Sequence, residues 1–515
     1  MTVFEEKHPY LTAAAGGLAA GLLFTSGFAP LSWSWAAAAA VAGWFFLVSR
    51  LTSVRAAALS GLCFGLGWFV PGLAWTMNSM AVHGRLPWAV AFAGLVLLGA
   101  VLSLFPTAAA AAAKRLAPTG CVRLMLSLAG MMTLAEWLRT DVIVGFGWLA
   151  PAYAFLDTPF VGWAPILGAD GVTLALMLSA ALAVTAAECR LRWLAVPVIA
   201  VALIVGTGKW AADHRWSAPS ETVDIRVLQP NLPVVNAFVR ASPAERIESM
   251  LPAASEPWPA DTGRAKLLLT PEGIVSVPVD RLSLEAAGAL FALQEKSDAM
   301  VLFNGFRREK RHYYNSSFVI DEGHVAYRLD KRELVPFGEY VPAGARWFVD
   351  LLGIPLADLT PGAPVQPLLP LGNASAGILI CYENLYGSVV RRFWQSGSPD
   401  FLIVTSNLGW FSDQILPQHL DMSRMRAMEC ARPLVSVSNS GLSAVVNSSG
   451  RVVKSLGVGE TGSMTLGLMG AQGEATPFVR FGGAPALLLA LLAAFNMLLS
   501  PAGLRMLKEI SGKRL

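Results

Sequence analysis

The sequence predicts a multi-span α-helical membrane domain joined to an α/β domain that lies outside the membrane. Three observations lead to this fold class. Hydrophobic residues make up 54% of the 515 residues and charged residues only 14%, whereas soluble globular chains carry about 25% charged residues. The charge is also uneven, because the first 208 residues hold only ten of the 39 Lys and Arg residues. After them, short apolar runs alternate with polar helical stretches, which is typical of an α/β fold.

Eight apolar stretches are candidates for membrane-spanning helices, which need about 20 mostly apolar residues. Several are shorter, and we expect flanking Trp and Gly residues to extend them. They cover residues 11–28, 35–48, 56–77, 88–113, 124–137, 172–187, 194–205 and 484–499. The sequence therefore predicts a seven-span membrane domain, a large outer domain, and a closing span with a tail, at residues 1–208, 209–480 and 481–515.

Basic residues in the short loops predict the orientation, since cytoplasmic loops carry an excess of Lys and Arg. With the N-terminus inside, twelve Lys and Arg residues fall on the inner side, and the short outer loops hold only Arg85 and Arg139. This bias predicts that both termini are cytoplasmic and that the large polar segment is outside. Glu136, near the outer end of the fifth span, is either a functional group at membrane depth or an ion-paired anchor beside Arg139.

The outer segment alternates predicted strands with predicted helices. Its short apolar runs have the length of strands and lie between turn signals. We expect strands at 223–228, 266–269, 299–303, 317–320, 324–329, 376–380, 401–404 and 434–437. We expect helices at 244–250, 282–295, 385–395 and 418–431.

Three reactive residues, Glu272, Lys331 and Cys381, stand shortly after predicted strands. The sites of α/β sheets gather where strands end. A thiolate nucleophile, a carboxylate that takes its proton and an ammonium that stabilises an oxyanion are the parts of covalent acyl transfer. Spacing alone does not establish such a triad. A lone cysteine after an apolar strand is more often a buried core residue, and a loop Lys or Glu is usually solvated.

The local sequences add to this interpretation. Segment 331–342 reads Lys-Arg-Glu-Leu-Val-Pro-Phe-Gly-Glu-Tyr-Val-Pro, segment 380–384 reads Ile-Cys-Tyr-Glu-Asn, and segment 270–273 reads Thr-Pro-Glu-Gly. Further along, segment 425–433 reads Met-Arg-Ala-Met-Glu-Cys-Ala-Arg-Pro and is followed by Ser-Asn-Ser-Gly at 438–441. In these motifs the chain resembles bacterial apolipoprotein N-acyltransferases, membrane-integral members of the nitrilase superfamily. The resemblance covers the whole chain, because that family has seven spans, a periplasmic catalytic domain and one closing span. It implies a nitrilase-like αββα sandwich for the outer domain.

By position, the resemblance implies that Cys381 is the nucleophile, Glu272 its general base, and Lys331 the group that stabilises the tetrahedral intermediate. Cys381 is then expected to attack the sn-1 ester of a membrane phospholipid, typically phosphatidylethanolamine, and to keep the acyl chain as a thioester. The N-terminal amine of a diacylglyceryl-cysteine apolipoprotein accepts the chain in a second, ping-pong step, which gives a triacylated lipoprotein. The implied location is the bacterial inner membrane, with the catalytic domain facing the periplasm. Because one chain carries a complete site, we expect a monomer, and we expect no cofactor.

The resemblance also implies supporting residues. Glu339 and Glu383 match further family glutamates, and Tyr382 is expected to contribute wall contacts and a backbone N–H for the oxyanion. Phe238 stands where the family often carries a substrate-contacting Trp, so that lipid contact departs from the family pattern.

Two apolar stretches are expected to form arms that dip toward the lipid surface and gate entry. One covers residues 347–357 and begins with Trp347, and the other contains Trp410, Phe411, Ile415 and Leu416. Ordinary core is the alternative interpretation of both stretches.

Other function classes are weakly supported. The six histidines form no H-x-x-H or H-E-x-x-H pattern, and no Walker-type loop or G-x-G-x-x-G fingerprint occurs, so neither a metal nor a nucleotide cofactor is expected. A net charge of +4 without a dense basic run does not suggest nucleic-acid binding. Two alternatives remain open. One is a membrane-tethered amidase that uses the same triad on a small amide, and the other is a transporter with an outer ligand-binding domain. Against the transporter, the spans hold almost no charged residue at mid-bilayer depth.

Overall fold

The computed structural model describes residues 8–117, 121–188, 194–234, 242–259, 262–341, 344, 346 and 358–496. The chain forms two compact units. One unit takes the residues up to 214, except 82–85, together with those from 480 onward, and the other takes 82–85 and 215–479.

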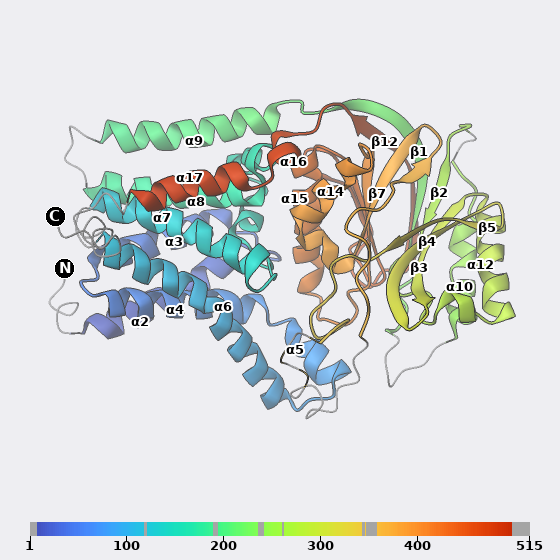
Figure 1. Ribbon diagram of the computed structural model, residues 1–515, viewed down its shortest axis with the longest axis horizontal. Coiled ribbons are helices and arrows are strands. Elements are labelled where there is room, and N and C mark those ends of the chain that lie inside the picture. Colours follow the sequence, from blue (N-terminus) through green and yellow to red (C-terminus); the bar gives the residue numbers. More distant parts are fainter. Residues whose placement is uncertain are drawn as a thin grey trace. The chain divides into compact units, whose positions relative to one another are not determined.

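The first unit is helical, and each of the eight apolar stretches predicted as spans coincides with a helix (Figure 1). Within the described residues, four helices are long and apolar enough to cross a membrane, at Val54–Gly72, Trp88–Leu116, Pro159–Ala187 and Ala195–Asp213. The main helices are α2 (Pro9–Thr25), α3 (Ser34–Arg50), α4 (Val54–Gly72), α6 (Trp88–Leu116), α7 (Cys121–Trp137), α8 (Ala164–Glu188), α9 (Ala195–Asp213) and α17 (Ala484–Phe495). Short helical turns connect them, namely α5 (Thr76–Asn78), η1 (Ser79–His83), η2 (Leu138–Val142), η3 (Pro151–Phe155) and η4 (Pro159–Trp163).

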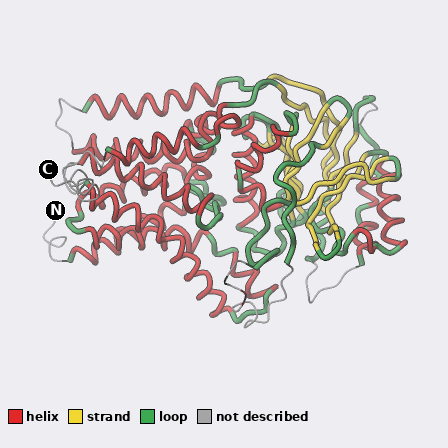
Figure 2. The backbone as a smooth tube through the Cα atoms, viewed as in Figure 1, coloured by secondary structure: helices red, strands yellow, loops and turns green. Residues whose placement is uncertain are grey.

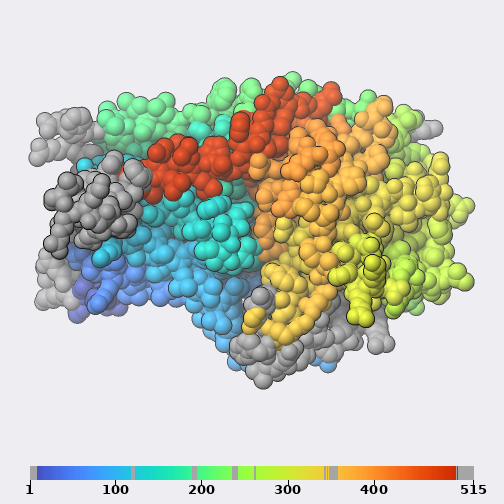
Figure 3. All heavy atoms as spheres, in the orientation of Figure 1, coloured from blue at the N-terminus to red at the C-terminus, as the bar shows by residue number. Residues whose placement is uncertain are grey.

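Glycines let helices α2 and α4 pack backbone against backbone. A Cβ atom at Gly21 would overlap the carbonyl oxygen of Phe64, and one at Gly17 would overlap that of Ser60. Small residues at such contacts are typical of helix pairs in lipid, where close packing replaces the hydrophobic driving force. In contrast, outward-facing side chains are large and apolar, as at Leu203 on α9, which is 64% exposed. Helix α17 lies on the visible face of the unit (Figure 3).

Glu136 is an ion-paired residue rather than a free acid. The fully buried Arg139 donates to its carboxylate at 2.6 Å and also to the carbonyl oxygens of Phe146 and Trp148, at 2.6 and 3.0 Å. These contacts fit the ion-paired anchor, one of the two roles predicted for Glu136.

The second unit contains two six-stranded sheets. The first has the order β12-β1-β2-β3-β4-β5 and the second the order β11-β10-β9-β8-β7-β6. Strands β1, β2 and β3 run parallel, as do β7, β8 and β9, and the outer strands are antiparallel to their neighbours. The first sheet consists of β1 (Ala218–Gln229), β2 (Lys266–Leu269), β3 (Met300–Glu309), β4 (His312–Asp321), β5 (His324–Asp330) and β12 (Gly462–Gln472). The second consists of β6 (Leu369–Leu371), β7 (Ala374–Ile380), β8 (Phe401–Ser406), β9 (Leu434–Ser438), β10 (Ala444–Val446) and β11 (Val452–Ser455).

Helices cover the outer faces of both sheets, so the unit is the αββα sandwich that the resemblance implied (Figure 2). A buried apolar core, with Ile225, Leu267, Ile378 and Ile403, fills the space between the sheets. Two further cores join each sheet to its helices. The helices are α10 (Pro243–Glu248), α11 (Leu251–Ala254), α12 (Leu284–Ser297), α14 (Gly387–Arg392), α15 (Ile415–Cys430) and α16 (Pro477–Phe481), with the short turns η6 (Val279–Arg281), η7 (Cys381–Leu385) and η8 (Phe393–Gln395).

All eight predicted strands are present, and most extend further than predicted. The sequence prediction missed β6, β10, β11 and β12. The predicted helix 385–395 was wrong in one respect, because it is divided into η7, α14 and η8. Tyr386 has an extended backbone between η7 and α14, which interrupts the helix.

Candidate active site

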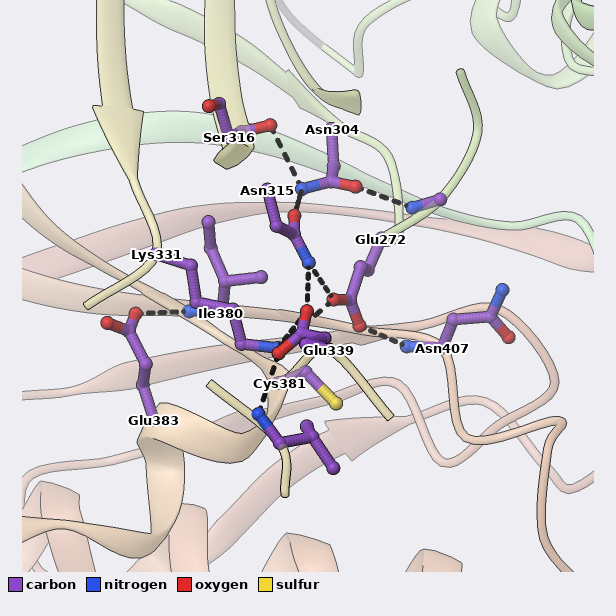
Figure 4. Close-up of polar contacts among 12 residues, drawn as sticks. Glu272, Asn304, Asn315, Ser316, Lys331, Glu339, Ile380, Cys381, Glu383 and Asn407 are labelled. Atoms are coloured by element: carbon purple, nitrogen blue, oxygen red, sulfur yellow. Dashed lines mark hydrogen bonds and ion pairs between the residues drawn. The ribbon is translucent and has the colours of Figure 1, made fainter. Parts of the chain in front are cut away.

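The three predicted residues Glu272, Lys331 and Cys381 meet at the ends of their strands (Figure 4). Thr270 and Pro271 connect β2 to Glu272, whereas Lys331 follows β5 directly and Cys381 follows β7 directly. Since β4 is antiparallel to both β3 and β5, strands β2 and β5 end at the same edge of their sheet. The Lys331 Nζ atom lies 3.5 Å from the Oε1 atom of Glu272.

Lys331 is a buried cation held between two carboxylates. Its side chain is only 1% exposed, and Nζ donates to Glu339 at 3.0 Å as well as approaching Glu272. Burial alone would lower the pKa of the Lys331 amine, but the carboxylates of Glu339 and Glu272 outweigh this effect and raise it above its ordinary value. The site therefore holds a fixed positive charge, which can stabilise an oxyanion.

Cys381 sits at the start of the turn η7 with a backbone φ of 50°, in the left-handed region that side chains rarely adopt. Burial, and next the negative charge of Glu272, raise the pKa of its thiol well above the ordinary value, against the opposing effect of Lys331. The thiol is therefore protonated in the resting site, and a base must remove its proton before it can attack. The Glu272 carboxylate lies close enough to the thiol to influence its pKa.

Glu383 ties the cysteine turn to the lysine loop. Its carboxylate, fully buried, accepts the backbone N–H of Ile380 at 2.8 Å and that of Arg332 at 2.7 Å. Ile380 precedes Cys381 and Arg332 follows Lys331, so this one carboxylate fixes the backbones of both reactive residues. Both predicted supporting glutamates thus lie at the site. Glu339 binds the Lys331 amine, and Glu383 binds the backbones next to Lys331 and Cys381.

Sequence reasoning missed two asparagines on adjacent strands. Asn315 on β4 donates its amide to Glu272 at 2.8 Å and to Glu339 at 2.7 Å. Asn304 on β3 donates to the amide oxygen of Asn315 at 2.7 Å. The available signal was their position inside strands, where asparagine is depleted.

Two further residues, Asn407 and His419, also contact the site. The backbone N–H of Asn407, at the end of β8, donates to Glu272 Oε2 at 3.2 Å. The Nε2 atom of His419 on α15 lies 3.3 Å from the carbonyl oxygen of Cys381. Burial lowers the pKa of His419 to about 4, so this ring is neutral near pH 7.

The remaining predicted residues have mixed outcomes. Tyr382 is buried and its ring lies edge-on to that of Tyr386, with 5.5 Å between centroids, which fits a wall contact. Trp410 and Phe411 are partly exposed, and their lipid contact stays a prediction. The predicted arm was wrong for Ile415 and Leu416, which are buried core residues at the start of α15. Phe238 and Trp347 lie outside the described residues.

Among the described residues, no group of three His, Cys, Asp or Glu side chains could hold a metal ion. What the site contains is a thiol, two carboxylates and an ammonium group, which together can carry an acyl group through a covalent intermediate.

Comparison with known proteins identifies two family models along the chain. Residues 20–182 match the apolipoprotein N-acyltransferase N-terminal domain, and residues 225–470 match the carbon-nitrogen hydrolase family. An apolipoprotein N-acyltransferase of Ralstonia nicotianae is 36% identical over 92% of this chain and 91% of its own length. One of Bordetella bronchiseptica is 34% identical over 94% of this chain and 95% of its own length.

Among solved structures, the crystal structure of an amidase from a Nesterenkonia species matches with a TM-score of 0.38 and 20% identity. The match covers 51% of this chain and 94% of the amidase.

Proposed function

The chain belongs to the apolipoprotein N-acyltransferase family, and we propose on that premise that it moves an acyl chain from a membrane phospholipid to the N-terminal amine of a diacylglyceryl-cysteine apolipoprotein. The observation that carries the proposal is the meeting of Glu272, Lys331 and Cys381 at three strand ends, with Lys331 Nζ 3.5 Å from Glu272. These are the groups that acyl transfer through a thioester requires.

In the first half-reaction, Glu272 takes the thiol proton of Cys381 and the sulfur attacks the carbonyl carbon of the sn-1 ester. The Lys331 ammonium, with the backbone N–H of Tyr382, stabilises the negative charge that develops on the carbonyl oxygen. The intermediate collapses and breaks the ester C–O bond. The departing alkoxide takes the proton from Glu272, which leaves a lysophospholipid and a thioester on Cys381.

In the second half-reaction, the α-amine of the apolipoprotein cysteine attacks the thioester carbonyl. Glu272 takes a proton from the attacking nitrogen and returns it to the departing sulfur of Cys381. An amide bond forms and the thioester bond breaks, so the enzyme returns to its starting state. One site thus serves two lipid substrates in turn, in a ping-pong sequence.

The location that we propose is the bacterial inner membrane, with the active site facing the periplasm and both termini in the cytoplasm. The apolar helices and the twelve-to-two bias of basic residues support this arrangement. Residues 1–208 and 481–515 would form the membrane part and 209–480 the catalytic domain. Drawing an acyl chain into water costs about 0.8 kcal/mol per CH₂ group, so a site close above the bilayer avoids most of that cost.

Trp410 and Phe411 are proposed lipid contacts, because they are partly exposed and begin three residues after Asn407, which binds Glu272. One chain supplies the whole site, namely the Cys381 thiol, the Lys331 amine and the carboxylates of Glu272 and Glu339. We therefore propose that the monomer is active.

The test is to incubate the purified full chain with phosphatidylethanolamine that carries a labelled sn-1 acyl chain. We expect a hydroxylamine-sensitive adduct on the wild type that is absent from Cys381→Ala and present on Cys430→Ala, a buried thiol on another core. A diacylglyceryl-cysteine peptide should then remove the label as a hydroxylamine-stable amide. Absence of any adduct overturns the proposal. An adduct that is hydrolysed but never transferred to the peptide indicates an amidase instead.

A further inference from the structure

Asn315 occupies the centre of the site although it is neither acid, base nor nucleophile. Its side chain is buried, with 6% exposed, and reaches the site from the middle of β4. Its single Nδ2 atom donates to Oε1 of Glu272 at 2.8 Å and to Oε1 of Glu339 at 2.7 Å (Figure 4). Both N–H bonds of one amide are therefore used on two different carboxylates.

The orientation of this amide is fixed by a second asparagine. The Oδ1 atom of Asn315 accepts from Asn304 Nδ2 at 2.7 Å, and that Nδ2 also donates to the carbonyl oxygen of Ser316 at 3.0 Å. The Oδ1 atom of Asn304 accepts the backbone N–H of Gly273 at 2.8 Å, directly after Glu272. A flipped Asn315 amide would bring two N–H₂ groups together, so only one orientation satisfies the pair.

The carboxylates of Glu272 and Glu339 share this donor atom and therefore lie close together. Lys331 supplies one positive charge against two negative charges. The groups that face both carboxylates are Lys331 after β5 and Cys381 after β7. Glu383, Tyr382 and His419 lie near enough to Lys331 to interact with its charge. Asn315 differs from all of these because it donates two hydrogen bonds and cannot take up a proton.

We propose that Asn315 is a positioning residue that holds the Glu272 carboxylate, through a donated hydrogen bond, in the orientation in which it can act as the base. This inference rests on the proposed function. Asn315 holds Oε1 of Glu272, which leaves Oε2, bonded to the N–H of Asn407 at 3.2 Å, with a second lone pair for the thiol proton.

The test compares the pH dependence of Cys381 acylation in the full-length wild type, Asn315→Asp and Asn315→Ser. Loss of donors to a carboxylate favours its protonated form, so the acidic limb of the rate profile should move to higher pH in Asn315→Asp. Asn315→Ser keeps one hydroxyl donor and should give a smaller shift in the same direction. Both variants should approach the wild-type rate at high pH. Asn447→Asp, on the turn after β10, is the matched control and should leave the profile unchanged, because Asn447 uses its oxygen as an acceptor.

The outcomes separate the two proposals. If the wild type forms no Cys381 adduct, the proposed function fails. If the wild type forms the adduct and both Asn315 variants lose rate equally at every pH, or keep the wild-type profile, the positioning role of Asn315 is overturned. A thermal unfolding midpoint for each variant identifies any variant that does not fold. In that case, the pH profile of acylation in the other Asn315 variant decides whether Asn315 has the proposed role.

Discussion

Glu383 offers the sharpest test of how the site is assembled. Its buried carboxylate accepts the backbone N–H of Arg332 at 2.7 Å and that of Ile380 at 2.8 Å, and the Arg332 side chain lies 3.6 Å away. Glu383→Gln keeps the shape of the side chain and one acceptor oxygen. The other end becomes an N–H₂ group that faces a backbone N–H, so one hydrogen bond is replaced by a donor–donor contact.

The magnitude follows from the bonds that are lost. A hydrogen bond to a charged group contributes about 1.5–3 kcal/mol, and a buried cation without its partner costs a further few kcal/mol. We expect the free energy of unfolding to fall by about 3 kcal/mol in Glu383→Gln. Ile380 is adjacent to Cys381, and Arg332 is adjacent to Lys331. Weaker hydrogen bonds to these two backbones should therefore loosen the placement of Cys381 relative to Lys331. A misplacement of about 1 Å costs roughly 100-fold in rate, so the acylation rate of Cys381 should fall by about that factor.

The assay measures the initial rate of the hydroxylamine-sensitive adduct at saturating phospholipid, together with the thermal unfolding midpoint in detergent. Glu333→Gln is the matched control. Its carboxylate is 35% exposed and pairs with Arg392 at 3.3 Å, and surface pairs of this kind contribute about 0–1 kcal/mol. If Glu383→Gln acylates as fast as this control, the carboxylate does not position the site and the reasoning is refuted.

Two further predictions concern stability. Burial lowers the pKa of His419 to about 4, so between the ordinary histidine pKa of about 6.5 and pH 4 the unfolded chain binds a proton that the folded chain does not. The free energy of unfolding should fall across this range as the pH drops, by up to about 3 kcal/mol, and His419→Gln should flatten the fall while the exposed His312→Gln should not. The measurement is the unfolding midpoint between pH 4 and 7. Equal slopes of midpoint against pH for the wild type, His419→Gln and His312→Gln would contradict this prediction. Gly21→Ala should lower the free energy of unfolding by about 1–3 kcal/mol, because its Cβ would overlap the carbonyl oxygen of Phe64 on α4. Gly43→Ala, with nothing within 4 Å of its Cβ, is the control, and equal midpoints for the two variants would disprove the contact.

The sequence predicted those parts of the fold that leave a continuous local pattern. Strands such as β2 and β8 are buried on both faces, so they appear as unbroken apolar runs. The missed strands lie at or near the sheet edges. Every residue of β11 is exposed to solvent, β6 and β10 have three residues each, and β12 contains glycines that disfavour strands. Their pairing with neighbours, not their own composition, makes them strands.

The site residues also fall into those with a local sequence pattern and those that depend on pairing between strands. Glu272, Lys331 and Cys381 follow strand ends, which a sequence can mark. Asn304 and Asn315 lie inside strands, and only the antiparallel register of β3 and β4 brings them together. No local spacing encodes a register between two strands, so the residues that hold Glu272 and Glu339 in place could not be predicted from their own positions.

The site depends on the packing of the two sheets against each other. Glu272 belongs to the first sheet and binds the backbone of Asn407 in the second, across 135 residues of sequence. Glu383 belongs to the second and binds the backbone of Arg332 after the first, across 51 residues. Both contacts cross the sandwich, so the placement of Glu272 and Cys381 depends on the core between the sheets. A substitution in that core therefore acts on the chemistry as well as on stability, even when it touches no reactive group.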